Sequence, residues 1–590
     1  MEKQWNLDKL YPDFDSREFA EDKKNFLSLL KEINSWSVEQ EQSPVQLAEK
    51  FINKLKKCYF YYSKLVAYSR LTVSVNAEDE RAQKEVEKLE KKITELTRSR
   101  VRFQKWLSEL DDRAKTLYEN SALLAEHEFF LEELAEKSQY LLSEEEEELA
   151  ARLQQTGSSA WSKLHQRLTS TLTVTLEVEG EKKELPLSEV RNMAYDKNAD
   201  IRKKAYEAEI AAYDKIEKGG AAALNAIKGE VLTMTEKRGY DSPLEKTLKD
   251  SRMEEKTLET LIEAIENSLS DFRKYLKKKA EILGHKKGLP FYDLFAPVGE
   301  VGLEFEYEEA AEFIVKNIRP LSSEMADFFK KAFSSSWIDA LPRANKRGGA
   351  FCYPIHPIQE SRVMANFTGS FSNMLTLAHE LGHAYHGHCL KEESILNTDY
   401  PMPLAETASI FSETAVHEAA LEEASPEERL VILENHLSGA TQIIVDIYSR
   451  FIFEKELFAE RKEASLSSDE LQSLMIQAQK EAYGDALDEE HLHPYMWLNK
   501  SHYYSAGQNY YNFPYAFGFL FGLGVYALKE DNDNFMEKYK SLLKVTGKKK
   551  ISEVAKQADI NPGAGEFWEK SLDKVREDIT LFIKLADEYA

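Results

Sequence analysis

The sequence predicts a mostly α-helical protein, and three stretches carry that prediction. Residues 16–153 contain few glycines, and apolar side chains recur every three to four positions, as between Phe51 and Tyr62, which sets one helix face against a core. Helices resume at residues 187–283 and again at about 370–388. Because single cores stop growing at roughly 250–300 residues, a chain of 590 residues predicts several domains or one elongated, multi-lobed body.

Two short stretches predict β structure. In residues 171–178, polar and apolar residues alternate and several are β-branched, which is typical of a strand. Glu179-Gly180 supplies a turn, so we expect a hairpin there. A boundary just after it divides the chain into an N-terminal helical region, residues 1–190, and a second region, residues 191–590. Within the second region, residues 346–353 lose the helical spacing and begin with glycines, which predicts a short strand.

The composition excludes several classes of partner. The net charge of -25 argues against nucleic acid or an anionic membrane surface, because both would be repelled. The longest apolar run, residues 515–528, is shorter than the roughly 20 residues that a bilayer requires. Only three cysteines occur, and the first residues lack the apolar segment of a signal peptide. We therefore expect a cytoplasmic protein. Nothing in the sequence specifies an oligomeric state.

The most informative motif is an HExxH sequence formed by His379, Glu380 and His383. Residues four apart on a helix lie on the same face, so the two imidazoles can bind one metal ion. Glu380 then lies beside the metal, where a carboxylate can act as general base for a water that the metal activates. The motif is typical of zinc peptidases, and the apolar residues on both sides of it favour a buried helix.

A catalytic zinc needs a third protein ligand and one open position. The metzincin pattern requires a glycine at position 386 and a histidine at position 389, whereas this chain has His386 and Cys389. A thermolysin-like spacing falls on Met402 and Pro403, which cannot bind zinc. The next candidate is Glu406, in an apolar segment that predicts a second helix. Glu413 lies seven residues further on the same face and can support a ligand histidine.

Several blocks of the chain resemble peptidase family M3, a family of zinc metallopeptidases, and within it the oligoendopeptidase F group. The similar blocks extend over almost the whole chain, and the central ones are highly specific. They are Trp5–Tyr11, Gly348–Ala350, Asn366–Gly369, Leu377–His386, Glu406–Glu413 and His502 with the tyrosines that follow it.

The resemblance implies an elongated, two-lobed helical body that encloses a deep substrate channel, with a small β-sheet next to the HExxH helix. It also implies one Zn²⁺ per chain, with Glu406 as the third ligand. In such enzymes, His and Tyr residues of a C-terminal segment stabilise the oxyanion, which assigns this role to His502, Tyr511 and Tyr515. The tyrosine spacing leaves Tyr510 as an alternative to one of them.

These observations predict a zinc-dependent endopeptidase that hydrolyses short, unstructured peptides. We expect the peptide to lie extended along the strand that begins at Gly348, Gly349 and Ala350, since glycines allow two backbones to approach closely. One alternative is an exopeptidase of the carboxypeptidase or dipeptidase type, which would need a pocket for a chain terminus. The other is a non-catalytic, peptide-binding helical scaffold.

Overall fold

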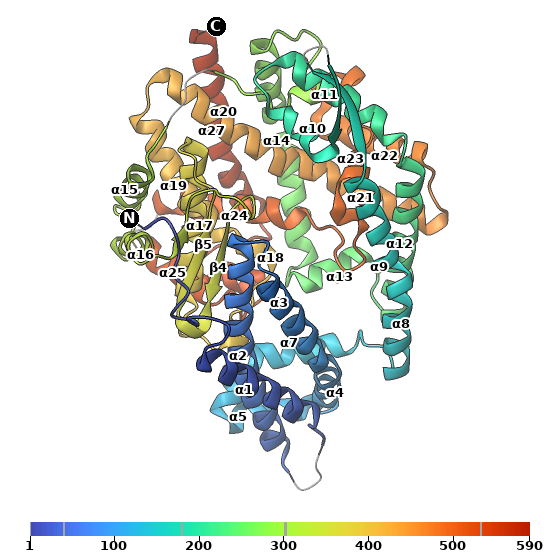
Figure 1. The fold of residues 1–590 in the computed structure, drawn as a ribbon, viewed down its shortest axis with the longest axis vertical. Helices are drawn as coiled ribbons and strands as arrows, with labels where there is room; N and C mark the ends of the chain where they lie inside the picture. The colour runs from blue at the N-terminus through green and yellow to red at the C-terminus, as the bar shows by residue number, and fades with distance from the viewer. Residues whose placement is uncertain (1, 39–41, 179–180, 300–303, 531–533, 590) are drawn as a thin grey trace. The chain divides into compact units, whose positions relative to one another are not determined.

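The computed structural model describes residues 2–38, 42–178, 181–299, 304–530 and 534–589, most of which are helical (Figure 1). Contacts between residues group the chain into two compact units, each assembled from three separate segments. Unit 1 comprises Met1–Gln139, Gly302–Ala420 and Leu528–Ile560. Unit 2 comprises Tyr140–Val301, Leu421–Ala527 and Asn561–Ala590. Neither unit begins or ends at residue 190, and the division predicted at that point stays a prediction.

Unit 1 contains the helical N-terminal region that the sequence predicts. Serines cap the N-termini of its first two long helices. Ser16 accepts a hydrogen bond from the N–H of Phe19, and Ser43 forms a reciprocal capping box with Gln46. The helices of this unit are α1 (Arg17–Asn34), α2 (Pro44–Val75), α3 (Glu80–Ile93), α4 (Thr97–Ser108), α5 (Lys115–Asn120), α6 (Ala122–Glu126), α7 (Glu128–Ser138), α15 (Tyr307–Ile318), α16 (Ser323–Ser334), α17 (Phe371–Cys389), α18 (Met402–Ala405), α19 (Thr407–Glu423), α25 (Phe535–Lys544) and α26 (Ile551–Ala555).

A small sheet in unit 1 packs against the HExxH helix, α17 (Figure 1). Its central strand, β5 (Glu360–Met364), pairs parallel with β3 (Ile338–Asp339) and antiparallel with β4 (Phe351–Ile355). Strand β4 is therefore an edge strand of the sheet as the structure describes it. Both β4 and β5 contact α17, which confirms the sheet expected beside this helix. Strand β4 overlaps the predicted strand only at residues 351–353 and continues to Ile355, because the chain before Phe351 is a loop.

Unit 2 packs long helices around the apolar segment at residues 515–528, which forms most of the buried helix α24. Trp568 of α27 lies edge-on to Phe517 of α24, with ring centroids 5.2 Å apart. The helices of unit 2 are α8 (Glu144–Thr156), α9 (Ser158–Ser170), α10 (Leu187–Asn192), α11 (Ala199–Tyr213), α12 (Glu217–Arg238), α13 (Pro243–Asp250), α14 (Glu255–Ile282), α20 (Pro426–Thr441), the π-helix η7 (Gln442–Asp446), α21 (Ile447–Glu463), α22 (Ser468–Tyr483), α23 (Met496–Asn499), α24 (Phe513–Ala527) and α27 (Gly565–Tyr589).

The predicted hairpin is also in unit 2. Strands β1 (Thr173–Val178) and β2 (Glu181–Pro186) pair antiparallel in the register that brings Thr173 opposite Pro186. The predicted turn, residues 179–180, lies outside the described residues. Mostly helical structure and both stretches of β structure are thus confirmed, whereas the two-lobed body with a deep channel stays a prediction.

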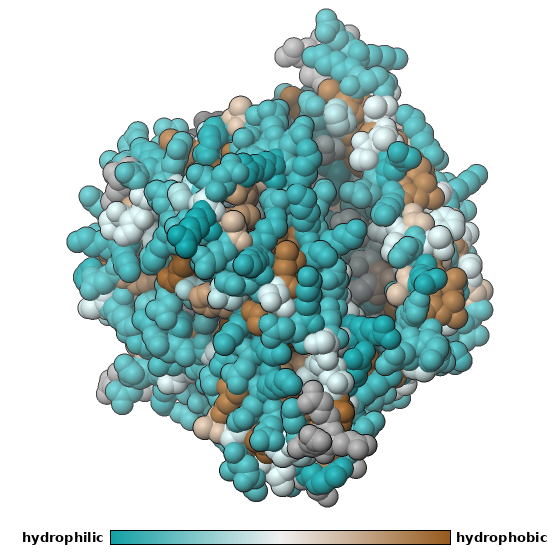
Figure 2. Space-filling model, turned by 60° about the horizontal axis from the view of Figure 1, so that its bottom comes forward, coloured by the Kyte–Doolittle hydropathy of each residue, from teal (hydrophilic) through white to brown (hydrophobic). Residues whose placement is uncertain are grey.

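Among the described residues, every helix is too short or too polar to span a bilayer. The face of the molecule drawn in Figure 2 is mostly hydrophilic, with hydrophobic residues in small groups between charged and polar ones. This surface agrees with the 31% of the residues that are charged.

Candidate active site

Helix α17 presents the HExxH side chains much as the sequence predicts. It begins at Phe371, where Ser370 caps it by accepting a hydrogen bond from the N–H of Asn373, and it ends at Cys389. His379 and His383 lie one turn apart on the same face, and their ring centroids are 4.9 Å apart. Both side chains remain partly accessible, with 24% and 19% of their surface exposed. The two imidazoles can therefore reach a common ligand.

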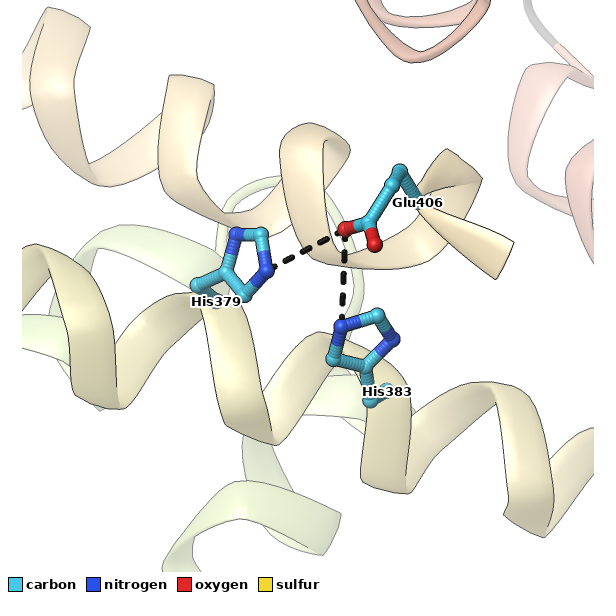
Figure 3. Close-up of side chains that lie close together, drawn as sticks. All are labelled: His379, His383 and Glu406. Atoms are coloured by element: carbon cyan, nitrogen blue, oxygen red, sulfur yellow. Dashed lines mark ion pairs between the residues drawn. The ribbon is translucent and has the colours of Figure 1, made fainter. Parts of the chain in front are cut away.

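Glu406 completes a group of three side chains that point at one another (Figure 3). It stands between α18 and α19, and its Oε2 lies 3.2 Å from Nε2 of His379 and 3.5 Å from Nε2 of His383. Tetrahedral zinc, with bonds of about 2.0–2.1 Å, separates such ligand atoms by roughly 3.3 Å. The group therefore has the spacing of a metal site with two nitrogens and one oxygen.

Gly382 allows α19 to come this close to α17. A Cβ atom at this position would lie 2.6 Å from the Cα of Ser409, and closer still to the carbonyl oxygen of Ala408. Both are backbone atoms of α19, which cannot move away as a flexible side chain can. The absence of a side chain at Gly382 thus sets the distance at which Glu406 meets the histidines.

Two carboxylates and a serine orient this group. Glu413 Oε2 accepts a hydrogen bond from Nδ1 of His379 at 2.9 Å, and the hydroxyl of Ser409 donates to Oε2 of Glu406 at 2.9 Å. Burial opposes a charge on His379, but its hydrogen bonds to Glu406 and Glu413 hold its pKa well above the ordinary value, so without a metal Nε2 carries a proton towards Glu406. A metal ion between the two groups takes the place of that proton, and these residues fit one.

The ionisation states of Glu406 and His383 also suit the binding of a divalent cation. Burial opposes a charge on Glu406, but its hydrogen bond with His379, the histidine charges and Ser409 together lower its pKa to about 2. Burial lowers the pKa of His383 to about 4, so this imidazole is neutral near pH 7. An anionic carboxylate with a neutral imidazole is the form in which both bind a metal.

Glu380 of the same helix lies next to the edge strand of the sheet. Its carboxylate accepts a hydrogen bond from the backbone of Cys352 in β4, and only 7% of the residue is exposed. Burial raises the pKa of Glu380 to about 7. A carboxyl group with such a pKa can accept and release a proton near neutral pH, as a general base requires.

The predicted peptide-binding residues Gly348, Gly349 and Ala350 form the loop that leads into β4. Both glycines are exposed, no heavy atom beyond their chain neighbours lies within 4 Å of where their Cβ atoms would be, and Gly349 has φ +81°. Asn366 holds the loop, because its Nδ2 donates to the carbonyls of Arg347 at 3.0 Å and Gly349 at 2.8 Å. The loop thus offers an open backbone in a fixed conformation.

The three oxyanion candidates come together in unit 2. The hydroxyls of Tyr511 and Tyr515 lie 2.8 Å apart, and the ring of Tyr511 lies 5.7 Å from that of His502. All three side chains are half-buried and keep some surface accessible. Tyr510 is buried instead, with its ring packed against Phe458 at 5.8 Å.

An asparagine that the sequence reasoning missed determines the tautomer of His502. Arg450 Nη1 donates to Oδ1 of Asn512 at 3.1 Å, and because arginine can only donate, the amide orientation of Asn512 is fixed. Its Nδ2 then donates to Nε2 of His502 at 2.8 Å. Burial and the charges of Arg450, Lys500 and Lys228 lower the pKa of His502 to about 3. His502 is therefore neutral, with its proton on Nδ1.

Two further residues that shape the metal group, Gly382 and Ser409, occupy positions that the sequence weakly indicates. Gly382 is a helix-interior glycine within the motif itself, where glycine costs stability unless packing requires it. Ser409 lies three residues after Glu406, one helical turn away. For Asn512 no local pattern exists, because its partner Arg450 is 62 residues distant in the chain.

Comparisons with known proteins match most of the chain to one family. A family model described as Peptidase family M3 matches residues 192–574, and one described as Oligopeptidase F matches residues 106–173. Group B oligopeptidase PepB of Streptococcus agalactiae is 26% identical over 401 residues, which cover 67% of this chain and 66% of that protein. Oligopeptidase PepF of Bacillus subtilis is 24% identical over 474 residues, or 76% of this chain and 68% of that protein.

Solved structures share the fold. Oligoendopeptidase-F of Enterococcus faecium aligns with a TM-score of 0.73 at 19% identity, over 97% of this chain and 99% of that chain. A solved chain from Chlamydophila abortus aligns with a TM-score of 0.82 at 22% identity, over 99% and 98% of the two chains. The family match extends over more than half of the sequence and confirms the resemblance of its blocks. The chain belongs to peptidase family M3.

Proposed function

We propose that this protein is a zinc-dependent endopeptidase that hydrolyses internal bonds of short, unstructured peptides in the cytoplasm. The observation that supports it best is the arrangement in unit 1: His379, His383 and Glu406 converge on one point, and Glu380 of the same helix α17 contacts the edge strand β4 through Cys352. A closed structural zinc site would have a fourth Cys or His ligand, whereas this group has three members among the described residues.

The residues divide the work between binding and proton transfer. One Zn²⁺ per chain, held by His379, His383 and Glu406, would polarise the scissile carbonyl and lower the pKa of a water molecule. Glu380 takes the proton of that water and delivers it to the leaving amine. Glu413 keeps His379 in the tautomer that binds metal, through its bond to Nδ1.

The edge strand provides the place for the substrate. A peptide that adds to the free edge of β4 gains backbone hydrogen bonds without any demand on its sequence. The open backbone at Gly348, Gly349 and Ala350 allows the two chains to approach closely. Only an extended segment can pair in this way, which excludes most bonds of a folded substrate.

We assign the stabilisation of the oxyanion to His502, Tyr511 and Tyr515. Charge develops on the carbonyl oxygen during hydrolysis, and a donor aimed at it contributes about 3–4 kcal/mol. His502 can donate from Nδ1, and the paired hydroxyls of Tyr511 and Tyr515 give at least one further donor. Tyr510 is less suited, because its ring is buried.

A decapeptide that is acetylated at its N-terminus and amidated at its C-terminus tests the proposal. We expect cleavage at internal bonds, because neither the metal group nor β4 requires a free chain end. Mass spectrometry of the products identifies the bonds that are cut. The same decapeptide inserted into an exposed loop of a stable folded protein should be cut at least about a hundredfold more slowly, since it cannot pair with β4 as an extended segment.

Two results would contradict this assignment. Cleavage of the unblocked peptide but not the blocked one, with loss of terminal residues only, would indicate an exopeptidase. Equal rates for the free decapeptide and the folded protein would remove the restriction to short, unstructured substrates. Absence of cleavage in a zinc-loaded sample of the full chain would instead favour a peptide-binding scaffold.

The variant Asn512→Asp tests the role of Asn512. A carboxylate next to His502 favours the imidazolium, so the pKa of His502 should rise from its low value towards and above 6.5. Nitrogen chemical shifts of labelled histidine measure this pKa and the tautomer directly. We expect kcat to fall about tenfold, with a change in its pH dependence between about pH 5 and 8.

Asn267→Asp is the matched control, because Asn267 is exposed on α14 of the same unit. It should leave both the tautomer and the pH profile unchanged. If Asn512→Asp lowered activity without moving the pKa of His502, the effect would be a structural one, and Asn512 would not position this histidine.

A further inference from the structure

Unit 2 contains a cavity of about 340 Å³ that none of the roles above uses. Its walls come from α10, α11, the end of α20, the π-helix η7 and the segment around Lys500. The volume lies within the range of small-molecule sites, roughly 300–1,000 Å³. A π-helix in a cavity wall is notable, because such turns occur often at functional sites.

Most charged side chains of the cavity wall are paired with an opposite charge in the described part of the chain, and one cation is not. Arg191 Nε lies 3.3 Å from Oε1 of Glu209, and Arg202 Nε lies 2.7 Å from Oδ1 of Asp293. Asp446, in η7, is paired with Arg450. Each carboxylate of the wall is thus matched by an arginine.

Lys500 has no such partner. Its ammonium group makes no hydrogen bond or ion pair with another residue that the structure describes, although the side chain is half-buried. Burial and the charge of Arg450 lower its pKa to about 8; Arg191 acts in the same direction, whereas Asp446 and Glu209 oppose the shift. An ammonium group in these surroundings is stabilised by an anion that enters the cavity.

The remaining wall indicates what kind of anion fits. A bare ion such as chloride is close in size to a water molecule, which takes up only about 30 Å³. It would therefore leave most of the 340 Å³ cavity empty. The rings of Tyr195 and Phe295, 5.1 Å apart, and the side chain of Met496 line the same cavity. These groups favour an apolar body.

We propose that this cavity binds a small monocarboxylate with an apolar body, its carboxylate paired with Lys500 and its body against Tyr195 and Phe295. Two sources have this chemistry: a free aryl or alkyl carboxylic acid, and the C-terminal end of a short peptide. The proposal does not depend on the peptidase reaction, because the cavity is formed by residues of unit 2 alone.

Isothermal titration of the full-length, zinc-loaded chain with 3-phenylpropionate tests it. We expect binding that is at least about tenfold tighter than that of 3-phenylpropanamide, which has the same shape without the charge. Lys500→Met should weaken the binding of the acid about tenfold or more, whereas Lys500→Arg retains a cation and should bind within about threefold. Lys204→Met, an exposed lysine on α11 of the same unit, is the matched control and should change nothing.

If Lys500→Met failed to fold, a second variant would still test the proposal. Tyr195 is 59% exposed, so its removal does not disturb a core, and Tyr195→Ala should weaken the binding of 3-phenylpropionate several-fold. N-acetyl-glycyl-phenylalanine, titrated into Glu380→Gln to prevent hydrolysis, separates the two sources. Tighter binding of this peptide than of 3-phenylpropionate assigns the cavity to a peptide C-terminus, and weaker binding assigns it to a free acid.

Three results would overturn the proposal. Equal affinity for the acid and its amide would show that Lys500 does not pair with the ligand. Unchanged affinity in Lys500→Met would place the carboxylate elsewhere, for example at the metal. Absence of binding of 3-phenylpropionate at millimolar concentration would leave the cavity without the proposed ligand.

Discussion

Replacing Glu380 with glutamine is expected to lower kcat by about 10²–10⁴, while the zinc content stays at one per chain. Glutamine has the shape of glutamate and can still accept the hydrogen bond from the backbone of Cys352, so the local structure should be kept. It cannot take up a proton, however. Zinc should remain because Glu380 is not one of the three side chains that converge. The rate is measured with a fluorogenic peptide and the zinc by elemental analysis.

Glu392→Gln is the control for this substitution. Glu392 is exposed in the loop after α17, and the same change of charge at this position should leave kcat unaltered. Activity of Glu380→Gln within about threefold of the unchanged protein would exclude Glu380 as the general base. Loss of zinc together with activity would show instead that this carboxylate supports the metal.

Gly382→Ala is expected to remove zinc and activity together, although alanine is the better helix former. The new methyl group would lie 2.6 Å from the Cα of Ser409, so α17 and α19 must separate. Inserting a methyl group into such a contact costs about 1–3 kcal/mol. Glu406 directly precedes α19 and would move with it. Since a displacement of about 1 Å can cost a hundredfold in rate, we expect at least that loss, and a metal affinity reduced about tenfold or more.

The control is Gly439→Ala, which makes the same change in the interior of helix α20. No heavy atom beyond its own helix lies within 4 Å of the position of the new methyl group. This variant should keep full activity and gain up to about 1 kcal/mol of stability, because alanine favours the helix. If Gly382→Ala retained zinc and activity, the close contact of the two helices would not set the position of Glu406.

Local patterns predicted much of the secondary structure. The apolar spacing in the N-terminal helical region, the alternation at Thr173–Val178 and the apolar run at residues 515–528 each correspond to an observed element. The start of β4 was less accurately predicted: the glycines before Phe351 form a loop that Asn366 holds from 17 and 19 residues away. A hydrogen bond between distant residues leaves no local pattern to read.

The residues of the candidate site also differ in how far the sequence alone predicts them. His379, Glu380 and His383 belong to one helix, so their spacing in the sequence already places them on one face. Glu406 was reached by elimination and by resemblance, and the structure then brought it to within 3.5 Å of both histidines. The burial of the rings, which depends on the tertiary structure, favours Tyr511 and Tyr515 over Tyr510 for the proposed role.

The sequence by itself determined the helical class, the motif on α17 and membership of peptidase family M3, because these rest on spacing within short segments or on residues in fixed order. Only the tertiary structure decided that Gly382 sets the distance between two helices, that Asn512 fixes the tautomer of His502, and that Lys500 lines a cavity without a paired carboxylate among the described residues. Each of these depends on contacts between residues far apart in the chain, where packing and hydrogen bonding, rather than local propensity, determine which groups meet.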